Sequence, residues 1–349
     1  MRILWLSPWF RSMARIHVEN LQRLGAEIML VTANLHFETD QPRHYETVLL
    51  GRPIPTAGWL PFFDAYREAK RFQPDIVVTE LLRDPRWRMF AKLAPRVRMI
   101  HDDKPHDEKH VAPWWNRLFF DRWDTGADAT IVFSKYVANS LHAAGLASSR
   151  LYVAPLISDL DQCLVPHFVH AESRKNFIMI GRQWPYKNHD VVFSAWEAHT
   201  RGTAWQGDEL VVIGRGEISR PLPAHARWES GAFQYRHVIP ELARSKGSIV
   251  HCRNASQSGV QVLSMQLGVS TLVSTAGALP EYQPAGCSIT GIDDIDGLAS
   301  AMDTLADAEE AEIQGKAAQE HFAKYYESPV AARRLLEIFH DILDRPVET

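Results

Sequence analysis

Two cations follow a short apolar segment in the second half of the chain and could bind phosphate. The segment Phe177–Ile180 runs into Gly181 and Arg182, and Lys187 comes five residues after the arginine, just before a helical pattern. A guanidinium grips two phosphate oxygens in a fork, an ammonium supplies a movable charge, and a helix N-terminus adds oriented N–H groups. This spacing favours a diphosphate site, although an exposed loop with an arginine and a lysine shows the same pattern.

A second apolar segment ends in glycines. Leu210–Ile213 is followed by Gly214-Arg215-Gly216. Missing side chains at such a turn either let the backbone approach a nucleotide or simply allow a tight turn. The pattern by itself leaves both interpretations open.

The third block lies between residues 254 and 281. It predicts a loop, a helix over 259–267, a glycine at 268, a strand and a second loop. That second loop contains Gly277 and ends in Pro280-Glu281. Glu281 could face a ligand or only balance the dipole of a short helix.

Short apolar runs alternate with longer segments of helical period along the chain, which is typical of βα repetition and a mainly parallel sheet. The predicted strands are 3–6, 27–32, 76–79, 98–100, 130–133, 176–180, 209–213, 248–251 and 271–274. The predicted helices are 16–24, 62–72, 189–199, 238–244, 259–267, 295–306 and 330–343. Because ligands of open α/β sheets bind at the carboxyl ends of strands, we expect function in the loops that follow them.

Length and composition narrow the class of protein. The chain has 349 residues, enough for two domains, and its formal net charge of −4 gives no general attraction to nucleic acid or anionic membrane. Three cysteines without a CxxC pair fit neither a disulfide framework nor a structural zinc site. No run approaches the roughly 18 apolar residues of a membrane span. We therefore expect a cytoplasmic protein.

In their order along the chain, these blocks resemble the retaining GT-B glycosyltransferases, particularly glycosyltransferase family 4, also called glycosyl transferases group 1. The first half adds a looser likeness in Ala127-Asp128, a strand, Ser134, a helix and Val153-Ala154-Pro155. His101-Asp102 matches the His-Asp of that family. The resemblance covers roughly residues 95–285.

The resemblance implies a GT-B fold: an α/β protein with two Rossmann-like doubly wound parallel-sheet domains facing a central cleft. Residues 1–160 would form the acceptor-side domain and 170–328 the nucleotide-sugar donor domain. Residues 329–349 would form a C-terminal helix that packs back on the N-terminal domain. Closure about a linker at 156–173 would bring donor and acceptor together.

The implied activity is transfer of a sugar, with retention, from a nucleoside diphosphate sugar to a hydroxyl of a carbohydrate or lipid-linked acceptor in polysaccharide or glycoconjugate biosynthesis. The nucleotide sugar is a co-substrate, and neither a cofactor nor a metal is expected. No nucleic-acid partner is expected. Peripheral contact with the inner face of the membrane stays open.

The resemblance also implies roles for particular residues. The residues expected in catalysis are Arg182, Lys187, His101 and Asp102. The residues expected to bind the donor are Gly181, Gly214, Gly216, Ser258, Gly259, Val260, Ser264, Gly277 and Glu281.

Two features depart from the family pattern. The family carries two glutamates separated by seven residues, and here those positions fall on Ala255 and Leu263, which leaves Ser264 or backbone groups as candidate ribose ligands. Where many members have a Gly-Gly loop, this chain has residues 7–15, whose Arg11 or Arg15 could take over the contact with phosphate.

The missing glutamates keep two other functions open. One is a catalytically weakened GT-B protein that binds a nucleotide sugar or glycan, or scaffolds a partner. The other is a nucleotide-sugar epimerase on the same fold, since fold alone does not choose the reaction.

Three further groups of residues could have a function or only a structural role. His106 and His110 have the spacing of a metal pair, but Pro105 and Pro113 argue for a polar loop. Tryptophans of the first half could stack on sugars or lie in the core: Trp59, Trp87, Trp114, Trp115 and Trp123. A basic cluster could face a lipid acceptor or only solvent: Arg83, Arg86, Arg88, Lys92, Arg96 and Arg98.

Overall fold

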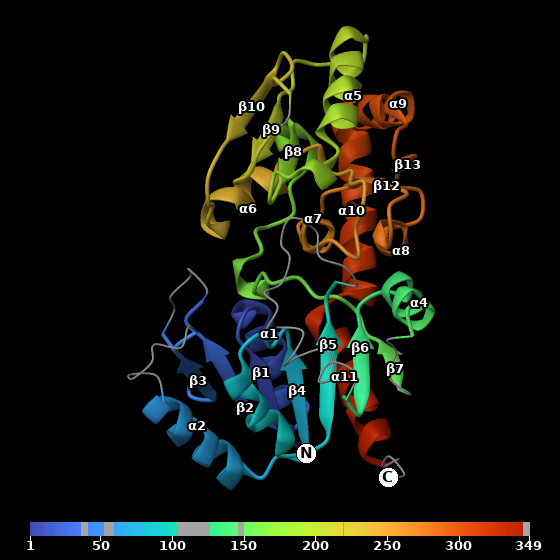
Figure 1. Ribbon diagram of the computed structural model, residues 1–349. Helices are drawn as coiled ribbons and strands as arrows, with labels where there is room; N and C mark the ends of the chain where they lie inside the picture. The colour runs from blue at the N-terminus through green and yellow to red at the C-terminus, as the bar shows by residue number, and fades with distance from the viewer. Residues whose placement is uncertain (36–40, 52–58, 103–125, 146–149, 219, 345–349) are drawn as a thin grey trace. The chain divides into compact units, whose positions relative to one another are not determined.

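The computed structural model describes residues 1–35, 41–51, 59–102, 126–145, 150–218 and 220–344 (Figure 1). The chain divides into two compact units. The first unit contains Met1–Asp159 together with Ser328–Thr349, and the second contains Leu160–Glu327. The C-terminal segment thus belongs to the first unit although the second unit separates the two in sequence.

The first unit is built on a seven-stranded sheet in the order β3-β2-β1-β4-β5-β6-β7, and its pairings are parallel. The strands are β1 Arg2–Ser7, β2 Glu27–Ala33, β3 Glu46–Leu49, β4 Ile76–Glu80, β5 Arg96–Ile100, β6 Ala129–Val132 and β7 Leu151–Val153. The strand order reverses between β1 and β4. In an open α/β sheet, the carboxyl ends of the strands at such a point are where ligands bind.

Helices cover both faces of this sheet. Helix α2 (Trp59–Phe72) packs Phe62, Ala65 and Ala69 on Leu4 and Leu6 of β1. Helix α1 (Arg11–Arg23) lies beside the C-terminal helix α11 (Ser328–Asp344), as Figure 1 shows. The Asn20 amide of α1 donates to the Ser328 hydroxyl at 3.1 Å, and the Tyr152 hydroxyl donates to Asp341 at 2.5 Å.

Shorter elements complete the first unit. They are helix α4 (Lys135–Ala143) and the 3₁₀ turns η1 (Pro85–Arg88) and η2 (Phe90–Lys92). Ser134 caps α4 by accepting a hydrogen bond from the Val137 N–H at 3.1 Å, as its position before the helix predicts.

The second unit has a six-stranded parallel sheet in the order β10-β9-β8-β11-β12-β13. The strands are β8 Phe177–Ile180, β9 Leu210–Ile213, β10 Ala226–Glu229, β11 Gly247–Val250, β12 Thr271–Ser274 and β13 Ile289–Thr290. Its order reverses between β8 and β11, so the loops after these two strands are the expected place for a ligand.

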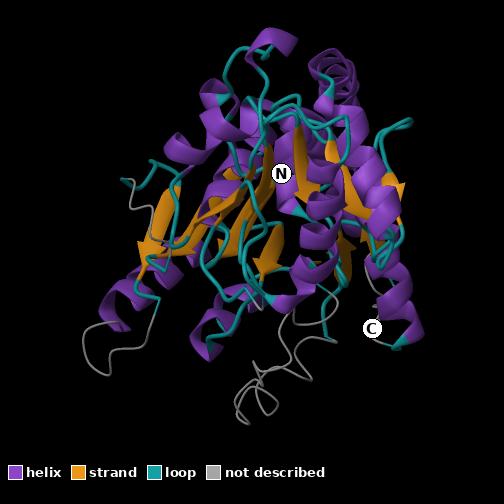
Figure 2. Ribbon diagram, turned by 90° about the horizontal axis from the view of Figure 1, so that it is seen from above, coloured by secondary structure: helices purple, strands orange, loops and turns teal. Residues whose placement is uncertain are grey.

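Alternate residues of β8 enter two different cores. Phe177 and Met179 pack with α5 (His189–Arg201) and α9 (Ile295–Ala306), whereas Ile178 and Ile180 pack with α6 (Tyr235–Ala243) and α7 (Gly259–Gln266). Figure 2 shows helices beside the strands on either side. Because both faces are buried, β8 and β9 are apolar throughout, as in other parallel sheets.

The remaining elements of the second unit are α8 (Leu279–Tyr282), α10 (Ala308–Tyr325), η3 (Gln162–Leu164), η4 (Ala171–Ser173) and η5 (Pro185–Lys187). Helix α10 packs against α7 and α9. The predicted fold class, an α/β protein with two doubly wound parallel sheets, is confirmed.

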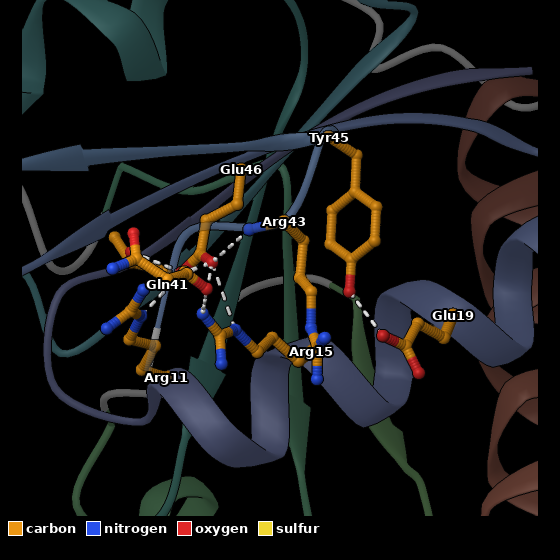
Figure 3. Close-up of polar contacts among 8 residues, drawn as sticks. Arg11, Arg15, Glu19, Gln41, Arg43, Tyr45 and Glu46 are labelled. Carbon is orange, nitrogen blue, oxygen red and sulfur yellow. Dashed lines mark hydrogen bonds and ion pairs between the residues drawn. The ribbon is translucent and has the colours of Figure 1, made fainter. Parts of the chain in front are cut away.

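A buried carboxylate fixes the first turn of α1 to the edge of the first sheet (Figure 3). The Glu46 carboxylate accepts hydrogen bonds from Arg11 Nε at 2.6 Å, from Arg15 Nη2 at 2.6 Å and from the Thr32 hydroxyl at 2.7 Å. Burial alone would raise the pKa of Glu46, but these hydrogen bonds outweigh it and lower the pKa to about 2. The cluster therefore stabilises the fold only while Glu46 is ionised.

We expect Glu46→Gln to lower the free energy of unfolding at pH 7 by about 3 kcal/mol, because it removes the buried charge that accepts hydrogen bonds from two buried guanidinium groups. The folded-state pKa of about 2 lies below the ordinary value of 4.5. The stabilisation is therefore complete above about pH 4.5 and is lost as the pH falls towards 2. Urea unfolding at several pH values measures this change.

The matched control is Asp64→Asn, which removes one partner of the exposed Asp64–Arg67 pair. It should change stability by less than about 1 kcal/mol. Equal stability of the Glu46→Gln variant and the unchanged protein at pH 7 would show that the cluster does not hold α1.

Candidate functional site

In the second unit, the loop after β8 carries the two predicted phosphate ligands. Arg182 is exposed at the start of this loop, directly after Gly181. Lys187 ends η5 and is only 4% exposed, and its Nζ donates to the carbonyl oxygen of Ile180 at 3.2 Å. Within the described residues, no carboxylate pairs with Lys187. In this part of the chain, its charge meets the Ile180 carbonyl and the face of the Tyr186 ring, whose centroid lies 5.9 Å from Nζ.

The start of α7 lies next to this lysine. A Cβ atom placed on Gly181 would be 3.8 Å from Lys187 Nζ and 3.9 Å from Val260 Cγ2. Ser258 caps α7 by accepting a hydrogen bond from the Gln261 N–H at 3.3 Å. The structure thus brings together Gly181, Lys187 and Val260. A cation beside the positive end of a helix dipole is a place where an anion binds.

The charge of Lys187 acts on two neighbouring groups. Burial, followed by the charge of Lys187, lowers the pKa of His189 to about 4, so this histidine is neutral at pH 7. Burial raises the pKa of the Cys252 thiol, and Lys187 opposes that rise only in part. Cys252 is therefore an unreactive thiol in spite of its place beside a cation.

Both glycines of the Gly214-x-Gly216 turn lie close to the backbone of the loop after β8. Gly214 has φ +129°, and a Cβ there would lie 1.9 Å from the Gly181 carbonyl oxygen. A Cβ on Gly216, at φ +152°, would lie 2.1 Å from the carbonyl oxygen of Gln183. Both glycines therefore let the two loops pack together, and they shape the site through the backbone of residues 181–183.

Gln183 and His189 complete this support and were not marked by any motif. The buried Gln183 side-chain amide donates to the carbonyls of Gly181 and Ile213, each at 3.1 Å. Its oxygen pairs with His189 Nε2 at 3.0 Å. The sequence signal available for them was a polar residue, Gln183, next to the Gly-Arg pair. It lies six positions before His189, which begins a helix.

The residues in and after α7 that are predicted to bind the donor differ in how far they are exposed. Gly277 has φ +54°, and a Cβ there would meet the carbonyl oxygen of Ala255 at 1.8 Å, so it too serves close backbone packing. Glu281 is exposed on α8. Ser264 is fully buried, and its hydroxyl donates to the Val260 carbonyl at 2.7 Å. The expected ribose contact of Ser264 therefore finds no accessible hydroxyl.

The two positions without the expected glutamates are also buried. Ala255 is 7% exposed, and its carbonyl accepts a hydrogen bond from the Ala278 N–H at 3.0 Å. Leu263 is 3% exposed and packs in the core between α7 and the sheet. Gly259 is exposed at the first position of α7.

In the first unit, His101 directly follows β5 and is 8% exposed. Its Nε2 lies 3.1 Å from Oε1 of Glu80, the last residue of β4. Its ring stacks on Phe10 at 4.1 Å and contacts Phe133 at 4.7 Å between centroids. Asp102 is exposed. No motif marks Glu80 in the sequence, and the only signal was a carboxylate at the end of an apolar strand.

The arginines considered as phosphate ligands near the N-terminus are used otherwise. Arg11 and Arg15 are both buried and hydrogen-bonded to Glu46 (Figure 3), which corrects the expectation that one of them contacts donor phosphate. Trp9 is 39% exposed, with the guanidinium carbon of Arg83 5.8 Å from its ring centroid.

The other candidate groups are only partly within the described residues. Trp87 is 1% exposed and belongs to the core, whereas Trp59 is 40% exposed. Arg86 pairs with Asp84 at 2.6 Å, and Arg96 is buried, so the basic cluster is not one solvated face. Trp114, Trp115, Trp123, His106 and His110 lie outside the described residues.

Among the described residues, no three His, Cys, Asp or Glu side chains gather as a metal site would require. No helix in the described part of the chain combines the length and the apolar character needed to cross a membrane.

Comparison with known proteins agrees with the resemblance seen in the sequence. Residues 13–162 match the model of Glycosyltransferase Family 4. No curated protein matches the chain. Sucrose-phosphate synthase from Thermosynechococcus elongatus superposes with a TM-score of 0.69 at 13% identity, covering 99% of this chain and 100% of that one.

Two further solved structures are similar. HepE from Anabaena, in complex with UDP and glucose, has a TM-score of 0.68 at 13% identity over 98% of this chain and 100% of its own. A UDP-forming trehalose-phosphate synthase from Burkholderia xenovorans has 0.66 at 11% identity over 98% and 99%. The fold is therefore the GT-B fold of these structures.

We expect Gly214→Ala to destabilise the second unit by about 2 kcal/mol more than Gly231→Ala, because its new methyl group would overlap the Gly181 carbonyl. Gly231 has φ +131°, close to the +129° of Gly214, and nothing lies within 4 Å of a Cβ there. The backbone strain of the two variants therefore cancels in the comparison. Thermal unfolding gives the difference, and equal melting temperatures would show that the two loops do not need this close contact.

Proposed function

We propose that the chain is a retaining glycosyltransferase that moves a sugar from a nucleoside diphosphate sugar to a hydroxyl of a carbohydrate or lipid-linked acceptor. The observation that carries the proposal is Lys187, a buried cation beside the N-terminus of α7 with no carboxylate partner in the described part of the chain. Similar structures support a uridine nucleotide, since HepE was solved with UDP and with UDP-glucose.

The proposed mechanism uses this positive site to stabilise the leaving group. The bond between the anomeric carbon and the diphosphate oxygen breaks, and the acceptor oxygen bonds to the same face of that carbon. The acceptor proton passes to the departing diphosphate. Lys187, Arg182 and the N–H groups of Gly259 and Val260 neutralise the charge that develops on the diphosphate, without a metal.

Some of the other predicted residues shape the diphosphate site, and others are proposed to lie near the donor sugar or to take part in the reaction. Gly181 lacks a side chain where the ligand would approach Lys187, and Ser258 holds the first turn of α7 in place. Gly214 and Gly216 act through that loop. Gly277 and Glu281 are proposed near the donor sugar, and His101 with Asp102 are the residues of the first unit assigned to the reaction.

The proposed setting is polysaccharide or glycoconjugate biosynthesis in the cytoplasm, with peripheral contact to the inner face of the membrane. Support for such contact comes from α2, which exposes Trp59, Leu60 and Phe63 near its start. Aromatic and aliphatic side chains of this kind enter the interfacial region of a bilayer.

We expect Lys187→Met to weaken binding of the matching nucleoside diphosphate about 10- to 100-fold, because a charge-assisted hydrogen bond is lost. The same change removes a buried cation that has no carboxylate partner in the described residues, so the melting temperature should stay equal or rise. A residue with a purely structural role would lower both. Calorimetric titration of UDP, GDP, dTDP and ADP, with and without EDTA, measures the affinity.

Arg182→Ala should weaken the same binding, and Arg201→Ala is the matched control. Arg201 is 77% exposed at the end of α5, where it pairs only with Glu197 in the described structure. Unchanged affinity in Lys187→Met would overturn the diphosphate site. Loss of binding in EDTA would overturn metal independence.

A second candidate function is binding of a nucleotide sugar without transfer. It is favoured by Ala255 and Leu263, which place no carboxylate where the resemblance implies two. The two functions differ in what happens to a bound donor, and an epimerase would change the sugar without any acceptor.

Incubation with radiolabelled nucleotide sugars, with and without a mixture of glycan and lipid-linked acceptors, separates these functions. The transferase proposal predicts label in an acceptor, with the anomeric configuration of the donor kept. Tight binding with intact donor would favour the binding protein, and an altered sugar still on its nucleotide would favour the epimerase.

A further inference from the structure

A buried carboxylate links two neighbouring groups at the reversal point of the first sheet. Trp5 of β1, Glu80 of β4 and His101 after β5 come from three adjacent strands. Trp5 Nε1 donates to Glu80 Oε2 at 3.0 Å, and His101 Nε2 lies 3.1 Å from Glu80 Oε1. Each carboxylate oxygen therefore has its own partner.

Glu80 is fully buried and yet ionised. Burial would raise its pKa, but the hydrogen bond and charge of His101, together with hydrogen bonds from Ser7 and Trp5, hold the pKa of Glu80 below its usual range. His17 stacks on Trp5 at 5.3 Å, and burial lowers the pKa of His17 to about 4, so it stays neutral beside this carboxylate. The carboxylate can act only as an acceptor.

We propose that Glu80 is a positioning residue that keeps a proton of His101 on Nε2, so that whenever the ring is neutral its lone pair lies on Nδ1. Since an ionised carboxylate cannot donate, the ring nitrogen that faces it must carry the proton. Phe10 and Phe133 pack on the same ring and restrict its rotation. The relevance of this tautomer to sugar transfer rests on the proposed function of His101.

The hydrogen bond from Trp5 to Glu80 allows a specific test of the proposed tautomer. An indole N–H only donates, so it always requires an acceptor. In Glu80→Gln the side chain has a single oxygen, which Trp5 would take, and its NH₂ group would then face His101. The imidazole nitrogen at that place would have to accept, and the proton would move to Nδ1. An amide in the corresponding place of a serine protease triad has this effect on the tautomer of its histidine.

The experiment is ¹⁵N NMR of histidine-labelled full-length protein, with the His101 signals assigned by their loss in His101→Ala. We expect the Nε2–H tautomer in the unchanged protein and the Nδ1–H tautomer in Glu80→Gln. Transfer by the Glu80→Gln variant should fall at least about tenfold in kcat. Retention of the Nε2–H tautomer in Glu80→Gln would overturn the proposal.

Two further variants separate positioning from stability. In the double variant Trp5→Phe with Glu80→Gln, the amide can turn its oxygen to His101, so the Nε2–H tautomer and part of kcat should return although packing is poorer. Glu80→Asp keeps the carboxylate and should keep this tautomer even if Glu80→Gln does not fold. A double variant that stays Nδ1–H would contradict the proposed role of Trp5 and Glu80.

The tautomer found by NMR does not depend on whether the diphosphate site is assigned correctly. The tautomer is measured without any substrate, whereas titration of UDP reports on Lys187 in the second unit. A tautomer change with unchanged kcat would overturn the catalytic relevance of the pair, and loss of UDP binding alone would not affect it.

Discussion

The buried ammonium group of Lys187 is the constraint around which the second unit is arranged. Among the described residues, the Ile180 carbonyl and the Tyr186 ring contact it but no carboxylate pairs with it, and the N-terminal end of α7 lies beside it. The close packing of Gly214 and Gly216 on the loop after β8 sets the backbone that leads from Gly181 to this lysine. An unmatched positive site of this kind is costly to bury unless it has an anionic ligand.

The central strands of both sheets could be predicted from sequence, because they are buried on both faces and therefore contain runs of mainly apolar residues. The four strands without a prediction are the sheet edges: β3, β7, β10 and β13. They are short and half exposed, so their apolar signal is weak. Helix α10 was also missed, since its buried stripe consists of Ala311, Gly315, Ala318 and Phe322, three of which are small.

The candidate site, too, could be predicted from the sequence only in part. The spacing of Gly181, Arg182 and Lys187 predicts a phosphate ligand, and the structure places Lys187 beside Val260, but their roles stay predictions. Contacts that depend on distant segments could not be predicted. The pairing of Arg11 with Glu46 joins α1 to an edge strand, and the pairing of His101 with Glu80 joins two neighbouring strands. No local pattern in the sequence encodes either of them.

A crystal structure of the protein with bound UDP would show whether Lys187 binds the donor diphosphate. We expect a phosphate oxygen about 3 Å from Lys187 Nζ and from the N–H of Val260 or Gly259, with Arg182 turned towards the same group. A nucleotide bound away from the loop after β8, with Lys187 still donating only to Ile180, would contradict this expectation.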